Sequence, residues 1–334
     1  MPIFERKSVR FFKLPSSLLL GAALLFPFKL LAEDQPDLLA PLPVLLDSID
    51  TSRDYLAGKF STFASDIDRF FGDDRNYQEG NKSVFQLDLT RVAGYGGDRK
   101  LVLSGRARLH LPTTEKRLHL LLETDPEKNI TGESTQGQSV VFNQVVAPGS
   151  VAVAARYEKV EERRWYFSTD AGIQFRGITS DPNPFARARG SYSVPLEQWR
   201  MKAAESVFWF NTIGVGESTQ LDLEHFLSET VLFRASSNAT WLRDKLNFDL
   251  RQDLSIYHTL DERTALLYQA SAIGVSRPQM QVTEYVVLLL YRYRLHKDWM
   301  FFELSPQLHF PRDLNFQSSP QLSMRLEMLF NESK

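Results

Sequence analysis

"LNFDLRQDLSIY", residues 246–257, alternates apolar and polar side chains along nearly its whole length. Successive side chains of a β-strand point to opposite faces, so this stretch has one apolar face and one polar face. The apolar face carries Leu246, Phe248, Leu250, Leu254 and Ile256, and the polar face carries Asn247, Asp249, Arg251, Asp253 and Ser255. Strands of soluble proteins usually have about 5–6 residues, whereas a tilted strand needs about 9–11 residues to cross a bilayer. Length and alternation together predict a membrane-spanning strand.

The same alternation recurs from residue 83 to the end of the chain. It is found in fourteen segments: 83–91, 100–111, 117–125, 150–158, 165–175, 185–194, 199–212, 217–227, 229–241, 246–257, 263–276, 281–295, 299–310 and 320–330. A soluble sheet with one charged face is the alternative, but that face would have to recur along nearly the whole chain. A wet barrel lumen accommodates charges at alternate positions, while the lipid-facing positions must be apolar. The sequence therefore predicts an all-β fold, an antiparallel transmembrane β-barrel of 12–14 strands formed by residues 83–334.

The first 32 residues have the organisation of a secretory signal peptide. Basic side chains between Arg6 and Lys13 precede an apolar run, and Ala32 supplies the small residue of a cleavage site. A membrane anchor is the alternative, but Pro27 and Lys29 shorten the apolar run below the roughly 18–20 residues of a spanning helix. We expect export and cleavage near Ala32, followed by a periplasmic linker and an amphipathic helix within 33–82.

The expected helix has one apolar face. Its members recur at steps of 4, 3, 4 and 3 residues, the spacing of one helix face: Leu56, Phe60, Phe63, Ile67 and Phe70. Such a helix can cover a sheet, lie on the membrane surface or plug the lumen. Apolar residues at inward positions of the barrel (Val286, Leu288, Leu290, Ala265 and Leu267) need a partner, so we expect the helix to dock inside the barrel or across its periplasmic mouth.

The connections and the tryptophans are consistent with a barrel whose N-terminus is periplasmic. Short gaps then fall on the periplasmic side, and the longest gap, 126–149, falls on the outer side. An aromatic girdle is expected at each rim of such a barrel. Trp165, Trp199 and Trp299 start strands and are predicted at one rim, and Trp241 is predicted at the other.

The last strand, "LSMRLEMLF" at 322–330, resembles the C-terminal signal of Gram-negative outer-membrane barrels, in which alternate apolar residues lead to an aromatic, here Phe330. Asn331–Lys334 depart from that pattern, in which the aromatic ends the chain. The pairing of "DIDRFFGDD" (66–74) with "DWMFFELSPQLHFPRD" (298–313) is similar to a group of proteobacterial outer-membrane proteins. These resemblances imply the outer membrane of a Gram-negative bacterium, contact with lipid and lipopolysaccharide, and recognition of the last strand by the barrel-assembly machinery. They imply no activity.

Catalytic, metal and cofactor patterns are missing. The chain has no cysteine, which excludes thiol chemistry and disulfides. A formal net charge of −2 does not favour a nucleic-acid partner. Ser255 and His258 are three residues apart and fall on opposite faces of a strand, so they do not form a nucleophile–base pair. His110 and His119 flank a short turn but have no nearby carboxylate to complete a metal site. We predict no enzyme, no metal and no cofactor.

The remaining candidate site is the lumen. Charged residues predicted to line it are Arg106, Arg108, Asp170, Arg187, Arg189, Arg234, Asp249, Arg251, Asp253, Glu284, Arg292, Arg294, Glu303, Arg325 and Glu327. They form either an arginine-lined path for anions or a set of cross-strand pairs that fills the interior. The first hypothesis is a narrow channel for small polar or anionic solutes. The second is a non-conducting structural or envelope-assembly barrel with the helix as partner contact, and an outer-membrane lipid hydrolase is third. The sequence leaves the oligomeric state open.

Overall fold

The computed structural model describes most of the predicted barrel. It covers Ile67, Phe70 and the segments 84–95, 97–110, 118–129, 149–161, 165–177, 181–196, 198–297 and 299–331. All of these belong to one of the two compact units of the chain, Ile49–Lys334. The predicted signal peptide lies outside the described residues, as do Leu56, Phe60 and Phe63 of the predicted helix. Ile67 and Phe70 are described, and both are helical.

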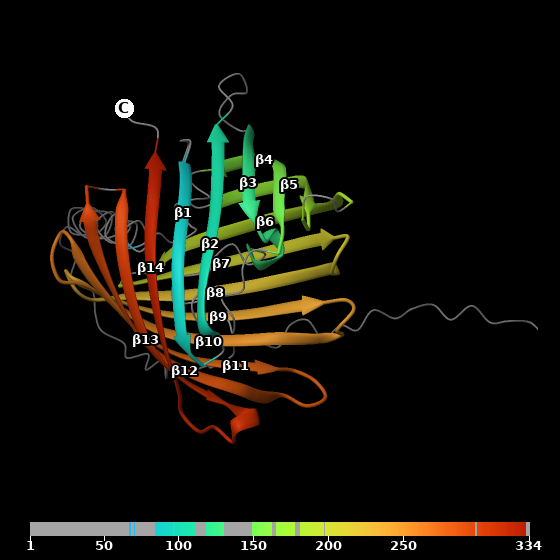
Figure 1. Cartoon of the computed structure of the whole chain (residues 1–334). Helices are drawn as coiled ribbons and strands as arrows, with labels where there is room; N and C mark the ends of the chain where they lie inside the picture. Colours follow the sequence, from blue (N-terminus) through green and yellow to red (C-terminus); the bar gives the residue numbers. More distant parts are fainter. Residues whose placement is uncertain are drawn as a thin grey trace, which may run out of the picture. The chain divides into compact units, whose positions relative to one another are not determined.

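Within the described part, fourteen strands form one closed antiparallel barrel (Figure 1). They are β1 (Val84–Gly94), β2 (Gly97–His110), β3 (Leu118–Thr124), β4 (Val151–Glu161), β5 (Trp165–Phe175), β6 (Asn183–Leu196), β7 (Trp199–Phe210), β8 (Gly214–Ser228), β9 (Val231–Leu242), β10 (Asn247–Thr259), β11 (Thr264–Val275), β12 (Gln281–His296), β13 (Met300–Pro311) and β14 (Ser319–Asn331). Each strand pairs with its sequence neighbours, and β14 pairs with β1 over eleven residues, from Asn331↔Val84 to Gln321↔Gly94. The predicted β-barrel is confirmed, at the upper end of the predicted strand number.

The alternation of the sequence separates an exterior from an interior. On β10, the outward-facing Leu254 is 50% exposed, while the preceding residue, the inward-facing Asp253, is 2% exposed. On β12, Val287 is 51% exposed and Val286 only 1% exposed. The register keeps the faces separate between strands, because Leu254 lies opposite Ala235 on β9 and Ala270 on β11. Closure leaves no unpaired sheet edge, so the backbone hydrogen bonds of the wall are satisfied by the wall itself.

The barrel has two distinct ends. We call the end where β1 begins and β14 finishes the termini end, and the opposite end the loop end. The long connection from Asp125 to Ser150 is at the loop end, as expected for the 126–149 gap. It starts with the 3-10 helix η1 (Pro126–Asn129), and a second one, η2 (Arg312–Leu314), follows β13. In the segments that the structure describes, no helix is long and apolar enough to cross a membrane.

The tryptophans lie near the strand ends. Trp165 and Trp199 begin β5 and β7, and Trp299 directly precedes β13, so these three are at the termini end. Trp241 is the last residue but one of β9 and therefore lies at the loop end. These positions match the predicted rims, and the role of the four residues as a membrane girdle remains a prediction.

Candidate functional site: the interior of the barrel

One charged network lies on the inner face of β3–β6. Asp170 on β5 is paired in register with Arg156 on β4 and Arg187 on β6. Arg156 donates from Nε and Nη2 to the two carboxylate oxygens at 2.6 and 2.8 Å, and Arg187 donates from Nε at 2.8 Å. The Nη2 of Arg187 then reaches Oε1 of Glu123 on β3 at 2.6 Å. Two arginines and two carboxylates thus satisfy one another across four strands.

A second network joins β12, β13 and β14. Arg292 donates to Glu303 and, from Nη2, to Oε1 of Glu327 at 2.6 Å. Arg325 donates from Nη2 to Glu303 at 3.0 Å and to Glu327 at 2.9 Å. Glu327 also lies 3.4 Å from Nε2 of Gln86, which extends the network across the closing β14–β1 pair. All four charged side chains are buried. The strand pair that closes the barrel is therefore also tied together from inside.

Smaller pairs continue the pattern. Glu224 on β8 accepts from Arg234 at 2.8 Å and from Arg200 at 2.6 Å. Arg251 binds the carboxylate of Asp253, two residues along the same strand, at 2.8 and 2.9 Å. In each of these contacts, an arginine is paired with a carboxylate.

Near the loop end, His309 on β13 has a carboxylate partner. Its Nδ1 lies 2.7 Å from Glu284, and the centre of its ring lies 4.9 Å from that of Tyr95 in the β1–β2 turn, with the two planes tilted by 35°. Partial burial raises the pKa of Tyr95, and the nearby carboxylates of Glu284 and Asp313 act in the same direction. The Tyr95 hydroxyl is therefore neutral at ordinary pH.

Most of the residues predicted to line the lumen are buried on the inner face. The buried ones are Arg108, Asp170, Arg187, Arg189, Arg234, Arg251, Asp253, Glu284, Arg292, Glu303, Arg325 and Glu327. Arg106 and Arg294 are partly buried. Asp249 stands apart, because its side chain is 44% exposed and it pairs with Lys245 at 3.3 Å near the loop end. Whether any of them contacts a solute remains a prediction.

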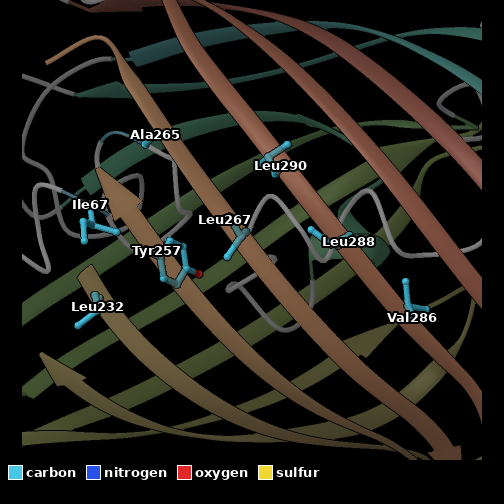
Figure 2. Packing of buried hydrophobic residues seen from close by; sticks show 8 residues of the cluster. All are labelled: Ile67, Leu232, Tyr257, Ala265, Leu267, Val286, Leu288 and Leu290. Carbon is cyan, nitrogen blue, oxygen red and sulfur yellow. The ribbon is translucent and has the colours of Figure 1, made fainter. Parts of the chain in front are cut away.

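An apolar stretch interrupts the charged interior on β9–β12. Its buried members are Leu232, Tyr257, Ala265, Leu267, Val286, Leu288 and Leu290, and Ile67 is packed into the same cluster (Figure 2). Phe70 packs against this cluster, with its ring 6.0 Å from that of Phe301 on β13. The guanidinium groups of Arg292 and Arg294 lie 6.0 and 5.5 Å from the centre of the Phe70 ring. The two described residues of the predicted helix thus contact the inner wall at the positions that the sequence left without a partner.

A second apolar cluster, near the loop end, was not predicted. Phe185, Phe208 and Phe210 point inward, with Phe185 and Phe210 stacked at 5.0 Å. The ring of Phe208 lies over Gly216 of β8, its register partner. The sequence signal was present, since Phe208 and Phe210 share the parity of Ser206, but β7 has apolar residues on both faces near its end.

The first turn of the long connection is attached to the barrel. The carbonyl of Pro126 accepts from Nη1 of Arg187 at 3.3 Å. Glu127 accepts from Arg176 at 2.9 Å and from the hydroxyl of Thr212. η1 is therefore linked to the β3–β6 network through Arg187.

Catalytic chemistry has no geometric support among the described residues. Ser255 is buried on the inner face next to Gln269, and His258 has the opposite parity. His110 and His119 are register partners on β2 and β3. The expectation that no carboxylate lies nearby was wrong, because Oε2 of Glu158 on β4 lies 3.5 Å from Nε2 of His119. In the described segments there is no group of three or more histidine, aspartate and glutamate residues placed to hold a metal ion.

Comparisons with known proteins find similar structures but no family. No protein-family model matches the chain, and no curated protein matches it in sequence. Among solved structures, OprB of Pseudomonas putida at high pH is 11% identical with a TM-score of 0.48, covering 78% of this chain and 97% of that one. A bacterial polysaccharide outer membrane secretin is 10% identical with a TM-score of 0.46, covering 76% and 99%. The KdgM porin in complex with disordered oligogalacturonate is 5% identical with a TM-score of 0.38, covering 73% and 99%. Likenesses this remote assign neither a family nor a substrate.

Proposed function

We propose that this chain is an outer-membrane β-barrel of a Gram-negative bacterium that forms a narrow channel for small polar solutes. The observation that carries the proposal is the distribution of side chains around a closed wall. Large apolar side chains such as Leu101 (65% exposed) and Leu103 (55% exposed) face outward, whereas arginines and carboxylates face inward. A barrel immersed in lipid requires an apolar exterior and tolerates a polar interior, while a soluble protein rarely exposes so large an apolar surface.

The size of the barrel and the contents of its interior favour a narrow path. About eight strands give an interior filled by side chains, and sixteen to eighteen leave an aqueous channel. Fourteen strands lie between these limits. The ion-paired side chains and the contacts of Ile67 and Phe70 narrow the interior further. We therefore expect the path to admit solutes of small size, and to be closed where Ile67 and Phe70 cover the wall of β9–β12.

The charges do not favour strong anion selectivity. Eight buried arginines on the inner face (Arg108, Arg156, Arg187, Arg189, Arg234, Arg251, Arg292 and Arg325) are accompanied by nine buried carboxylates (Glu123, Glu158, Asp170, Asp222, Glu224, Asp253, Glu284, Glu303 and Glu327). The two sets nearly cancel, and many members are paired directly. The balance favours small polar solutes of either sign over anions alone.

The route to the membrane follows from the sequence. Residues 1–32 serve as an export signal removed near Ala32, and the barrel-assembly machinery recognises the C-terminal strand that becomes β14. Phe330 on this strand stacks against Trp299 at 5.9 Å, at the end where chain termini of the barrel meet. The exterior then contacts lipid and lipopolysaccharide.

A non-conducting structural barrel is the second candidate. It is favoured by the complete pairing of Asp170 and by the burial of Leu232 and Leu267 under the segment that carries Ile67. In that case the N-terminal segment is a permanent part of the core and a contact for an envelope partner.

Single-channel conductance of the refolded chain in a planar bilayer tests both candidates. The unaltered protein is compared with the double variant Ile67→Ser/Phe70→Ser, and with the conservative control Ile67→Leu/Phe70→Tyr. Steady openings of the unaltered protein support the channel. Openings that appear only in the serine variant support a channel closed by this segment. Silence of all three proteins, inserted and folded, contradicts the channel and leaves the structural barrel.

A further inference from the structure

A polar patch interrupts the apolar exterior on β7–β10. It consists of Glu205, Glu217, Thr219, Ser237 and Gln252, which we call the β7–β10 patch. All five have the parity of the outward-facing residues, and all except the partly buried Glu217 are exposed. Thr219 donates its hydroxyl to Glu205 at 2.7 Å, and Ser237 donates to the side-chain oxygen of Gln252. Gln252 is also the position that breaks the apolar face of the stretch 246–257.

The patch is central on the wall. Glu205 is the seventh of twelve residues in β7, and Ser237 is the seventh of twelve in β9. On β7, Glu205 lies between Trp199 and the exposed Trp209, which mark the two ends of the strand. The other charged side chains that the structure describes on the exterior face, Arg91 and Lys159, lie within three residues of a strand end. Interfacial water is within reach of those two and not of Glu205.

The register places the members next to one another. Glu205 and Thr219 are direct partners on β7 and β8, and Ser237 and Gln252 are direct partners on β9 and β10. The two pairs are offset by two residues, since Thr219 lies opposite Ala239 and Leu221 lies opposite Ser237. Neighbouring strands are about 4.8 Å apart and two residues along a strand cover about 6.6 Å, so the patch spans only a few residues in each direction.

Small side chains lie beside several of the polar ones, while Trp241 lies opposite Glu217 and Leu221 lies opposite Ser237. Gly190 on β6 is the partner of Glu205, and Ala203 is the partner of Leu221. Ala239 is the partner of Thr219, and Ala272 is the partner of Gln252. Small side chains at a contact between membrane-embedded elements let the two backbones approach closely.

We propose that the β7–β10 patch is the interface of a two-fold dimer with a second copy of this chain. The inference rests on the proposed membrane location, because a carboxylate and an amide at mid-height facing hydrocarbon carry a free-energy cost that a polar partner surface removes. The partner must itself lie in the membrane. The patch contains acceptors (Glu205 and Glu217) together with an amide donor, Gln252, which gives one of its two N–H groups to the carbonyl of Asp253. The hydroxyls of Thr219 and Ser237 donate within the patch. A two-fold interface sets this surface against itself, so it can place the second Gln252 N–H of each copy against Glu205 of the other.

The absence of cysteine from the chain makes a cross-linking test clean. Ala239→Cys introduces a single thiol at the centre of the patch, and Ala155→Cys introduces a matched one on the exterior of β4, five strands away. Both variants are reconstituted in lipid vesicles at the same low density and oxidised. We expect a dimer-sized product from Ala239→Cys that exceeds the product from Ala155→Cys at least tenfold. No product, or equal products from both variants, overturns the proposal.

A second measurement does not depend on cysteine. The mass of the full chain in mild detergent or nanodiscs is compared with that of Glu205→Leu/Gln252→Leu and of the control Ala155→Leu. We expect the unaltered protein and the control to be dimers and the double variant to be a folded monomer. A monomeric unaltered protein, or a dimer that survives the double substitution, overturns the interface. The outcome is separate from the channel proposal, since a monomer that inserts and conducts contradicts only the dimer.

Discussion

The interior walls of β4–β6 and of β9–β12 are built in opposite ways. On β4–β6, which we call the polar wall, Asp170 has a counter-charge on each adjacent strand, Arg156 and Arg187, at 2.6–2.8 Å. The carboxylate of Asp170 is thus satisfied by its own register partners. On β9–β12, the inner face carries a buried apolar cluster, which we call the apolar wall, and its members Leu232 and Leu267 are 0% exposed. Charged side chains such as Arg234 and Glu284 share the inner face of these strands. The apolar wall faces the middle of the barrel, so its burial needs a segment outside the wall, and Ile67 belongs to that cluster.

Substitutions in the two walls are therefore expected to destabilise the protein for different reasons. A charge removed from the polar wall leaves its partners buried without a counter-charge, whereas an apolar side chain removed from the other wall leaves a cavity. Among the described residues, Ile67 of the N-terminal segment packs against the second wall. Substitutions in each wall test this contrast.

Asp170→Ala is expected to have the largest effect. It leaves Arg156 and Arg187 buried without the carboxylate that both contact, and such a loss costs about 3–5 kcal/mol of unfolding free energy. Urea unfolding of the refolded protein in vesicles measures the loss. Asp249→Ala is the matched control, because that side chain is 44% exposed and an exposed pair contributes about 0–1 kcal/mol. Equal losses for the two variants contradict the buried network.

Leu232→Ala tests the apolar wall. Truncation of a buried leucine costs about 2–5 kcal/mol, depending on how far the cavity collapses. The double-mutant cycle with Ile67→Ala measures whether the N-terminal segment shares this cavity, and residues in contact give coupling energies of about 0.5–3 kcal/mol. The same cycle with Asp170→Ala is expected to be additive, since Asp170 belongs to the other wall. A coupling energy of zero between Ile67 and Leu232 would contradict a direct contact between the N-terminal segment and the apolar wall.

Gly216→Ala probes the apolar cluster at the loop end, which extends from Phe185 on β6 to Phe208 and Phe210 on β7. An added Cβ at this position lies 2.4 Å from the Phe208 ring and 2.6 Å from the backbone oxygen of Trp241. The ring must move, and overpacking of this kind costs about 1–3 kcal/mol. Gly190→Ala is the control, because nothing lies within 4 Å of its added Cβ. Thermal unfolding should show a lower transition temperature for Gly216→Ala alone.

The strands could be predicted from the sequence because successive side chains face the exterior and the interior of the barrel in turn. Apolar and polar residues therefore alternate along each strand. The fourteen alternating segments correspond one to one to β1–β14, and Val286, Leu288 and Leu290 were recognised as inward residues without a partner. The pairing of Asp170 with Arg156 and Arg187 was not readable, because it depends on the register of three strands. Phe208 and Phe210 were missed because β7 has apolar residues on both faces near its loop end.

Arg176→Ala is expected to have the smallest effect. Arg176 reaches Glu127 of η1 at 2.9 Å, but its side chain is 48% exposed and that of Glu127 is 21% exposed. Water and salt screen such a pair, so its removal should change the unfolding free energy by about 0–1 kcal/mol. The change should vanish near 1 M salt, where the Debye length is about 3 Å. Arg187, which holds the Pro126 carbonyl of the same turn from inside the barrel, should by contrast keep its contribution in salt. Suppose instead that Arg176→Ala lowers the unfolding free energy by more than about 2 kcal/mol and that this loss persists in salt. Glu127 would then belong to the buried network with Glu123, and the Arg176 contact to η1 would be no weaker than the Arg187 contact from inside the barrel.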